Sequence, residues 1–545
     1  MLSTFLKKAA AGEPVYITDV REAFQARGTR PFHVHVTRYD RTVRVFPLAL
    51  PAASGEAETG FAAEYIHACI YNILSALGAL RVDIYLDRQD AALLELAENL
   101  DCVFQTDCPK NRRSGYGKCL NVNERVLSAL FQGQERFAFR IFDLENEPVV
   151  SETLGLPPNQ SIFAQLPGRT AGKKLLGMDV GGTDVKLVVS VDGKLAHCEE
   201  FDWNPASFTR PEELTGPLLE LAQRLRAVGE DVRNFDAIGL CFPDVVIQNR
   251  IVGGETPKTQ GMRSNPDLNY EAQFAQITSL ADALSTYVVP GGRVRCINDG
   301  PMAAFTAAVE CAAGGVDLSQ GFFAHTLGTD LGTGWVRPDG SIPDIPLEVY
   351  NFIIDLGSWD QRAFPPQDVR SVRSVNTGLP GALQKYGGQS AVFRLVAKRT
   401  PEILQEALDA GLFRWEADCL VVPTQPEDRR KEALEFFMER AERDPDCQDI
   451  FREIGEAMAV VWRETDDILR PEAEERSLFG RLVKRPACFC LIQEGAARQE
   501  PDLRLLAADS TLANTPLMKQ LDAHPGYTVA QFAQAVGAVY YGCLE

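Results

Sequence analysis

The chain has 545 residues, enough for roughly two to four domains of ordinary size. Hydrophobic residues make up 45% of it and charged residues 24%, a balance typical of a globular protein with a sizeable core. The net charge of −20 argues against a duplex-DNA surface, which needs a basic face, so we expect no nucleic-acid partner.

The first residues place two lysines after a short apolar stretch, whereas a secretory signal begins with charge and continues with a longer apolar run. No uncharged apolar stretch reaches about 18 residues, so we expect no membrane span. The 13 cysteines are scattered, and many lie inside apolar segments, as free thiols do in a reducing compartment. These features together predict a cytoplasmic protein.

Residues 1–147 have the pattern of an α/β domain. Alternating apolar residues predict a hairpin of strands at 32–39 and 42–50, followed by a helix at 61–80 and further strands and helices. His33 and His35 project to one face of their strand and invite a metal interpretation, but they lack the tight spacing of a ligand pair. The same holds for Cys102, Cys108 and Cys119. The role of this region stays open: it could form a homodimer, gate a cleft or bind a ligand of its own.

A segment rich in proline, glycine and polar residues at 148–172 reads as a linker. Three strands follow, the second and third joined by a hairpin turn at Asp192-Gly193, and then helices and strands alternate. This order is expected of one lobe of a ribonuclease-H-like fold. The elements that we expect are strands at 175–180, 185–191, 195–201, 235–242 and 293–297, with helices at 211–228 and 270–286.

A further strand pair at 322–336 would open a second lobe. Residues 357–485 are mostly helical in pattern, and a strand at 487–493 and a helix at 528–541 close the chain. We therefore divide the chain into an N-terminal domain (1–147), a linker (148–172), a first lobe (173–300) and a second lobe with a helical insertion (301–545).

The first chemical motif runs from Asp179 to Lys186 and joins two apolar strands. Its paired glycines, Gly181 and Gly182, let the backbone approach a phosphate closely and leave amide groups free to bind its oxygens. Asp179, at the end of the preceding strand, could hold a hydrated Mg²⁺ against those phosphates. A plain glycine hairpin is the structural alternative.

Two more motifs follow. The glycine-rich stretch from Gly328 to Gly334 also lies between strands and would supply a second turn on the phosphate chain. Asn298 and Asp299 stand where a strand runs into a helix that starts near Pro301. Asp299 can act as a general base for an attacking hydroxyl, with Asn298 orienting the substrate. The alternative is that Asp299 only caps the helix.

These three motifs, in this order and spacing, resemble the ROK family of sugar kinases, repressors and open-reading-frame proteins. The resemblance covers 173–350 well and 487–542 loosely. It implies a two-lobed, ribonuclease-H-like fold of the actin–hexokinase type, here preceded by an α/β N-terminal domain. It also implies ATP and Mg²⁺ as cofactors and a small-molecule substrate, a sugar or a sugar-like metabolite.

The resemblance also implies the roles of individual residues. Asn298 and Asp299 match the sugar-binding dipeptide with its catalytic Asp, and Glu348 and Asn351 match a further sugar-binding segment. The implied nucleotide-binding residues are Asp179 (through Mg²⁺), Gly181, Gly182, Thr183, Lys186, Gly328, Thr329, Gly332 and Gly334, with Gly495 in a turn on the adenosine side.

The chain also departs from the family pattern. Asp244 follows Pro243 where the family has glycine, Asp330 replaces a glycine of the second turn, and Asn351 stands where the family has histidine. The cysteine cluster that binds zinc in the family is absent, so we expect no zinc. A carboxylate at 330, about 4 Å from a phosphate oxygen, would cost on the order of 4 kcal/mol without a bridging Mg²⁺.

The leading hypothesis is ATP-dependent phosphotransfer to a hydroxyl of a sugar or sugar-like metabolite. The alternative is a non-catalytic sensor or regulator that keeps the kinase fold as a ligand clamp. A third reading is another member of the actin–hexokinase superfamily, such as an ATPase activator or a kinase of a non-sugar.

Overall fold

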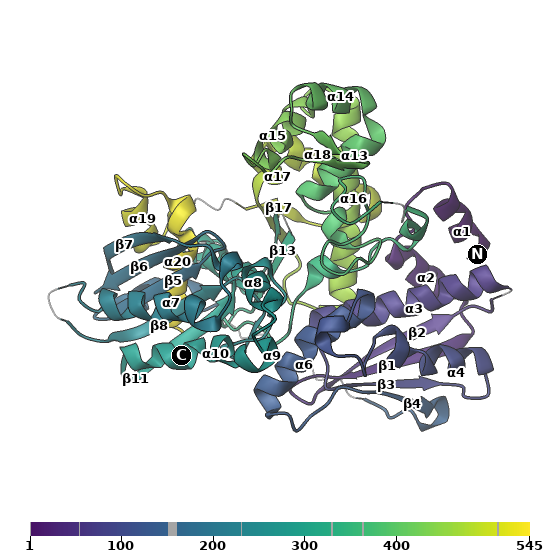
Figure 1. Cartoon of the computed structure of the whole chain (residues 1–545), viewed down its shortest axis with the longest axis horizontal. Helices are drawn as coiled ribbons and strands as arrows, with labels where there is room; N and C mark the ends of the chain where they lie inside the picture. Colours follow the sequence, from purple (N-terminus) through teal and green to yellow (C-terminus); the bar gives the residue numbers. More distant parts are fainter. Residues whose placement is uncertain are drawn as a thin grey trace.

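The computed structural model describes residues 2–53, 55–150, 161–229, 232–328, 331–361, 364–508 and 512–545. Part of the expected linker lies outside these residues. Figure 1 shows an N-terminal α/β unit at the lower right, a second α/β unit on the left and a helical region at the top. All 13 cysteines are free thiols. No helix within the described ranges is long and apolar enough to cross a bilayer.

A mixed sheet of four strands, in the order β2-β1-β3-β4, forms the centre of the N-terminal unit. Strand β1 pairs antiparallel with β2 and β3, and β3 pairs parallel with β4. Phe32, Val34 and Val36 of β1 are fully buried on one face, while His33 and His35 both bond Glu147 on the other. The strands are β1 (Arg30–Thr37), β2 (Val43–Leu50), β3 (Arg81–Leu86) and β4 (Phe139–Asp143).

The helices of the N-terminal unit connect it to the rest of the chain. Helix α3 (Glu56–Leu77) packs against α16 (Pro445–Leu469), and one continuous hydrophobic core runs from the N-terminal sheet into this helical region. Inside that core, the fully buried carboxylate of Glu464 pairs with Arg21 at 2.6 Å. The other helices of the unit are α1 (Leu2–Ala10), α2 (Ile17–Arg27), α4 (Ala91–Glu98), α5 (Leu100–Val103) and α6 (Lys118–Phe131).

The first lobe is built on a sheet of five strands in the order β11-β8-β5-β6-β7. Strand β6 runs antiparallel to β5 and β7, whereas β8 is parallel to β5 and to β11. This antiparallel meander with two added parallel strands is the ribonuclease-H-like arrangement that the element order predicts. The strands are β5 (Lys174–Val180), β6 (Asp184–Val191), β7 (Lys194–Asp202), β8 (Phe235–Phe242) and β11 (Val288–Asn298).

Helices cover both faces of this sheet. Helix α7 (Pro211–Leu225) begins at a proline, and Glu213 accepts hydrogen bonds from the amides of Thr209 (2.6 Å) and Arg210 (3.0 Å), which caps the helix. The prediction of a single helix at 270–286 is wrong, because the segment is broken into short helices and a 3₁₀ turn. They are α9 (Tyr270–Gln273), α10 (Ala275–Thr278), α11 (Leu280–Leu284) and a 3₁₀ turn; α8 (Gln260–Ser264) precedes them.

The second lobe contains a smaller sheet in the order β13-β12-β16-β17. Strands β12 and β13 form an antiparallel hairpin, and β16 and β17 add to it in parallel. Strands β17, β16, β12 and β13 follow one another in this sheet as β11, β8, β5 and β6 do in the first lobe. Among the described residues β7 has no counterpart. The strands are β12 (Phe322–Leu327), β13 (Leu331–Val336), β16 (Arg476–Phe479) and β17 (Leu505–Ala507). A mixed, two-lobed α/β fold is therefore confirmed.

The helical insertion lies between β13 and β16, as its sequence pattern predicts. The expected strand at 487–493 is wrong: these residues belong to α18 (Pro486–Gln499), which packs along α16. A short apolar run fits a buried strand and a buried helix equally well. Between β13 and β16 the insertion also contains α13 (Gln389–Arg399), α14 (Pro401–Asp409), β14 (Arg414–Glu416), β15 (Cys419–Val421) and α15 (Arg430–Arg440); α17 (Arg481–Lys484) and α18 follow β16.

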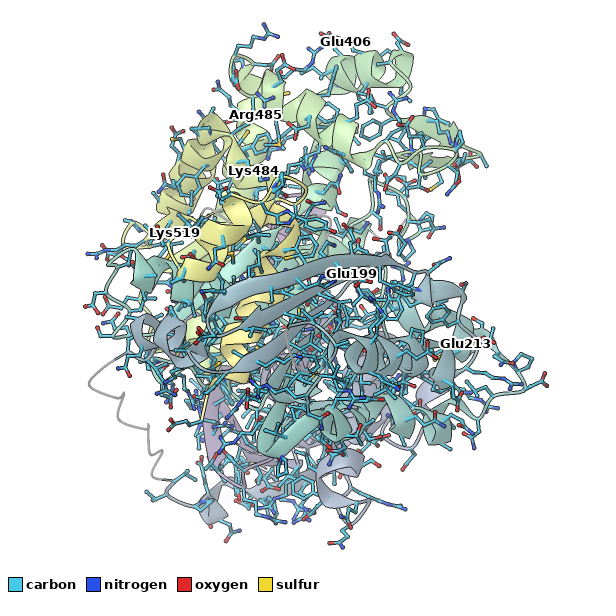
Figure 2. All side chains as sticks on the ribbon, turned by 90° about the vertical axis from the view of Figure 1, so that its left-hand side faces the viewer. Glu199, Glu213, Glu406, Lys484, Arg485 and Lys519 are labelled. Atoms are coloured by element: carbon cyan, nitrogen blue, oxygen red, sulfur yellow. The ribbon has the colours of Figure 1, made fainter. Side chains whose placement is uncertain are left out.

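The last helix, α20 (Val529–Gly542), returns to the first lobe, as expected at 528–541. It packs on β5 and β8 at glycines: a side chain at Gly177 or Gly239 would overlap the carbonyl oxygens of Ala535 and Ala538. Helix α19 (Pro516–Asp522) precedes it. Charged side chains such as Glu213 and Lys519 lie at the periphery of the molecule (Figure 2).

Candidate active site

The start of α12 (Asp299–Ala313) is the centre of the candidate site. The cap of this helix is Asn298, whose Oδ1 accepts from the amide of Gly300 at 3.0 Å and whose Nδ2 donates to the carbonyl of Asp244 at 2.7 Å. Asp299 also accepts from Gly300 at 2.9 Å but keeps its side chain exposed. Because Asn298 already caps the helix, capping alone does not account for Asp299.

Three further carboxylates gather around Asp299. Asp179 lies one residue before the end of β5, opposite Cys241 of β8 and Lys186 of β6, and burial raises its pKa to about 6. The negative charge of Asp299 adds to this rise. Asp299 is open to solvent on one side, yet surrounding protein desolvates its carboxylate and raises its pKa as well.

Asp244 is the second of these carboxylates and is only 5% exposed. Its two oxygens accept from the amides of Val245 at 2.8 Å and Gly254 at 2.7 Å, and burial raises its pKa to about 6. A side chain at Gly253 would overlap the carboxylate of Asp244. Asp244, which stands where the family has glycine, therefore holds the loop at 253–254 against the end of β8.

Glu348 is the third. Burial raises its pKa to about 7, and the charges of Asp244 and Asp299 add to the rise. Its amide donates to the carbonyl of Ser75 at 3.0 Å, at the C-terminal end of α3, so the N-terminal unit helps to position it. Asn351 donates to Glu348 at 3.2 Å, while its own Oδ1 is buried without a hydrogen-bond partner in the described structure.

Lys258 is a site residue that the sequence analysis missed. It lies in a 3₁₀ turn (Pro257–Thr259), and its positive charge acts to lower the pKa of both Asp299 and Asp244 against the effect of burial. A Cβ atom placed on Gly182 would lie 3.4 Å from Cε of Lys258. Lys258 thus lies between the first glycine turn and the carboxylates. In the sequence, only the short segment Pro-Lys-Thr could have indicated this residue.

The first glycine turn connects β5 and β6, as predicted. The amide of Gly181 donates to the carbonyl of Asp184 at 2.7 Å, which closes the turn. Gly182 and Thr183 are exposed, and within the described ranges their amides have no acceptor. Lys186 pairs with the carboxylate of Asp184. Two free amides at an exposed turn suit a phosphate oxygen.

The second glycine stretch is arranged differently from the expected turn. Gly328 follows β12, Thr329 and Asp330 lie outside the described residues, and Gly332 and Gly334 are part of β13. A Cβ atom on Gly334 would lie 2.5 Å from Cβ of Ala304 and would overlap the carbonyl of Gly300. Gly334 therefore lets β13 pack against the start of α12, directly beside Asp299.

The adenosine-side turn predicted at Gly495 is wrong. Gly495 lies inside α18, where a side chain would overlap the backbone carbonyl of Arg452 on α16. A glycine turn after a second-lobe strand is found instead at Gly480, which follows β16, has φ of 99° and lies against the backbone of Leu327. In the sequence, a glycine directly after the short apolar run that ends at Phe479 could have indicated this turn.

Asp179 is the residue that we expected to hold Mg²⁺ through water. No group of three or more His, Cys, Asp or Glu side chains in the described chain is arranged to hold a metal ion directly. Mg²⁺ keeps several of its waters and often takes one or two carboxylates from a protein. The carboxylate of Asp179, next to the exposed turn, fits that mode of binding.

Comparison with known proteins gave matches only among solved structures. No protein-family model and no curated protein matches the chain. A ROK family glucokinase from Streptomyces griseus, in complex with glucose and AMPPNP, is 17% identical and matches over 67% of this chain and 98% of its own, with a TM-score of 0.40. A ROK hexokinase from Thermus thermophilus is 16% identical over 68% and 97% of the two chains, with a TM-score of 0.40.

A hexokinase from Schistosoma mansoni, complexed with glucose, is 16% identical over 70% of this chain and 88% of its own, with a TM-score of 0.38. At these TM-scores the fold assignment rests on the strand order of the two sheets. The solved structures similar to this chain thus include a ROK family glucokinase, a ROK hexokinase and a hexokinase.

Proposed function

We propose that this protein transfers the γ-phosphoryl group of ATP to a hydroxyl of a sugar or sugar-like metabolite. The observation that carries the proposal is the exposed carboxylate of Asp299 at the start of α12, with Asn298, Asp244 and Glu348 around it. Several carboxylates and amides around one point can accept and donate hydrogen bonds to a polyhydroxylated ligand.

Asp299 acts as the general base. A raised pKa lies closer to neutral pH and makes the carboxylate a stronger base than that of an ordinary aspartate. The charge of Lys258 opposes this rise and favours the ionised carboxylate. Asn298, fixed by its hydrogen bond to the backbone of Asp244, orients the attacking hydroxyl toward Asp299.

Glu348 and Asn351 also bind the substrate. The buried Oδ1 of Asn351 has no hydrogen-bond partner in the described structure and can accept from a substrate hydroxyl. Glu348, with a pKa of about 7, can accept or donate depending on its protonation. In this proposal Asn351 takes the place of the family's histidine.

The phosphate chain of ATP binds at the first glycine turn. The free amides of Gly182 and Thr183 donate to phosphate oxygens, and Lys258 supplies a positive charge next to Gly182. Asp179 would hold Mg²⁺ through water, and the ion would neutralise part of the phosphate charge.

The test is formation of ADP by the purified full chain over a panel of hexoses and amino sugars. Asp299→Asn should keep nucleotide binding and lower turnover by about 10²–10⁴-fold, because it removes the general base. Asp267→Asn, an exposed carboxylate, is the matched control and should keep full turnover. Unchanged turnover in Asp299→Asn rejects the assigned base. A sugar that raises the melting temperature without any ADP being formed would point to the sensor instead.

A further inference from the structure

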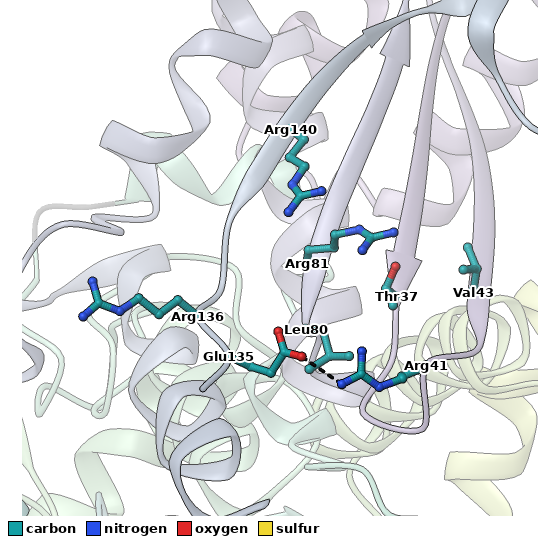
Figure 3. A pocket seen from close by; sticks show the side chains of 8 residues that line it. All are labelled: Thr37, Arg41, Val43, Leu80, Arg81, Glu135, Arg136 and Arg140. Atoms are coloured by element: carbon teal, nitrogen blue, oxygen red, sulfur yellow. Dashed lines mark hydrogen bonds and ion pairs between the residues drawn. The ribbon is translucent and has the colours of Figure 1, made fainter. Parts of the chain in front are cut away.

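A small pocket in the N-terminal unit lies outside the candidate active site (Figure 3). It has a volume of about 180 Å³, and six polar side chains line it: Thr37, Arg41, Arg81, Glu135, Arg136 and Arg140. Four of the six are arginines, in a chain whose net charge is −20. Four positively charged side chains at one pocket of a negatively charged chain indicate an anionic ligand at that pocket.

Strand pairing brings these side chains together. Thr37 at the end of β1 stands opposite Arg81 of β3, and Arg140 of β4 stands opposite Asp83, two positions further along β3. Alternate residues of a strand face the same side, so Thr37, Arg81 and Arg140 share the sheet face opposite the hydrophobic core. Arg41 comes from the β1–β2 turn, and Arg136 from the segment between α6 and β4.

The positive charge of the pocket is only partly neutralised. Arg41 pairs with Glu135 at 2.8 Å, and Nε of Arg81 pairs with Asp83 at 2.9 Å. In the described part of the chain, Arg136 and Arg140 have no ion pair. Four guanidinium groups against two carboxylates leave an excess of positive charge around the pocket.

Thr37 provides a second, independent observation. The residue is only 5% exposed, and its Oγ1 is a buried hydroxyl with no hydrogen-bond partner in the described structure. A buried hydroxyl without a partner is costly, and the usual reason for keeping one is a ligand or a water that completes its hydrogen bonds. Thr37 lines the pocket with the arginines, so both observations indicate the same ligand position.

We infer that this pocket binds the phosphate group of a small phosphate monoester. Guanidinium groups recognise phosphate oxygens by paired, charge-assisted hydrogen bonds, and the hydroxyl of Thr37 donates one more. A water occupies about 30 Å³ of liquid, so the pocket has room for roughly six waters, or a phosphate with a short carbon fragment. The inference does not rest on the proposed phosphotransfer, because no residue of the pocket belongs to the cluster around Asp299.

The test measures binding to the full-length chain by titration calorimetry at constant ionic strength. Glycerol 1-phosphate, inorganic phosphate and glycerol are the probes. We expect saturable binding of glycerol 1-phosphate, no binding of glycerol, and affinity lowered about tenfold or more in Arg136→Gln/Arg140→Gln, because charge-assisted hydrogen bonds are lost. Both arginines are exposed, so the double variant should keep the melting temperature of the wild type.

Two further variants locate the binding. Lys258→Gln, which removes the cation of the candidate active site, should leave the affinity for glycerol 1-phosphate unchanged. Thr37→Val removes a buried hydroxyl without a partner, so it should lower the affinity while keeping or raising the melting temperature of the unliganded protein.

Other results would overturn the inference. The site is wrong if binding survives loss of both arginines or is abolished by Lys258→Gln. The ligand class is wrong if inorganic phosphate binds and glycerol 1-phosphate does not. Absence of saturable binding by either anion rejects the pocket as a phosphate site.

Discussion

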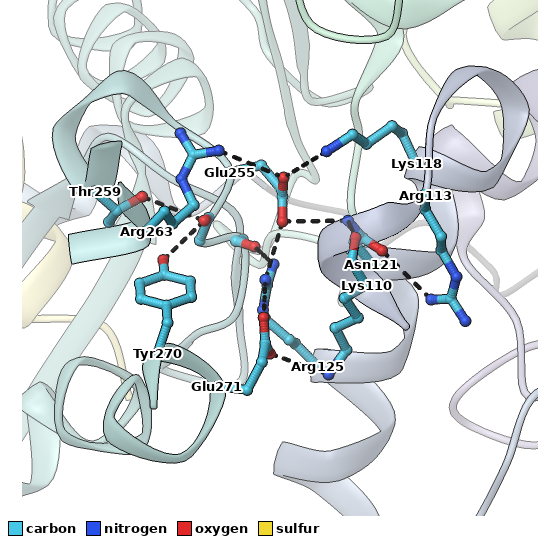
Figure 4. A network of polar contacts seen from close by, with 12 residues as sticks. Lys110, Arg113, Lys118, Asn121, Arg125, Glu255, Thr259, Arg263, Tyr270 and Glu271 are labelled. Carbon is cyan, nitrogen blue, oxygen red and sulfur yellow. Dashed lines mark hydrogen bonds and ion pairs between the residues drawn. The ribbon is translucent and has the colours of Figure 1, made fainter. Parts of the chain in front are cut away.

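Arg125 of α6 and Glu271 of α9 form an ion pair at 2.6 Å that joins the N-terminal unit to the first lobe (Figure 4). Arg125 also donates to the carbonyl of Gly253 and pairs with Glu255 at 2.9 Å. Burial acts to lower the pKa of Arg125, but its hydrogen bond and charge pairing with Glu271 outweigh burial and raise it. The loop at 253–255, which precedes Lys258, is thus held from the N-terminal side.

The same unit also reaches the other side of the candidate site. The amide of Glu348 donates to Ser75 of α3, and that of Leu347 donates to Ala76, each at 3.0 Å. The N-terminal unit therefore contacts both the segment that carries Lys258 and the segment that carries Glu348. We expect it to fix the relative position of these two segments.

Replacement of Arg125 tests the importance of this contact. Arg125→Met leaves the carbonyl of Gly253 and two carboxylates without their partner, so we expect a loss of about 2–4 kcal/mol in the free energy of unfolding. Urea denaturation measures this loss. Arg224→Met is the control, because Arg224 pairs with Glu199 at the surface and should cost under about 1 kcal/mol. Equal losses in the two variants would contradict a structural role for the network.

The pH dependence of stability tests the carboxylate cluster. Burial raises the pKa of Asp179 and Asp244 to about 6 and that of Glu348 to about 7. The folded protein then holds protons that the unfolded chain releases, so these groups reduce stability as the pH rises from about 4 through 7. Between pH 5 and pH 8, Glu348→Gln should lose less stability than the wild type, by about 1–3 kcal/mol.

Urea denaturation at the two pH values measures this difference. Glu439→Gln, at an exposed position of α15, is the control and should follow the wild type. A Glu348→Gln protein whose stability falls as steeply as that of the wild type would mean that Glu348 is ionised normally in the folded state.

Two glycines of β13 provide a matched pair of substitutions. Gly334→Ala would force a methyl group against Gly300 and Ala304 and move the start of α12, so we expect a loss of about 1–3 kcal/mol and weaker turnover. Gly332→Ala would place its Cβ 3.7 Å from Cβ of Thr326, an ordinary contact, and should leave stability nearly unchanged. Thermal unfolding and ADP formation measure both effects. If Gly332→Ala is the more damaging variant for stability, the packing role given to Gly334 is wrong.

Much of the first lobe was predictable from local patterns. The strands β5, β6 and β8, the hairpin turn at Asp192-Gly193 and the helix after Asn298 all appear where alternation and turn residues indicated. Each of these signals acts over a few neighbouring residues. The helix α18 was mistaken for a strand because a run of six apolar residues does not distinguish the two, although Pro486 at its first position is a helix-start signal.

The sequence by itself determined the glycine turn after Asp179, the Asn298-Asp299 pair at the start of a helix and the order of strands in the first lobe. Only the tertiary structure decided that Asp244, Lys258 and Glu348 lie around Asp299, and that Gly495 packs inside a helix. The physical reason is that these positions, and the raised pKa values of the carboxylates, depend on burial and on charges that are distant in the sequence. Both depend on which distant segments pack together, and local periodicity carries no information about that.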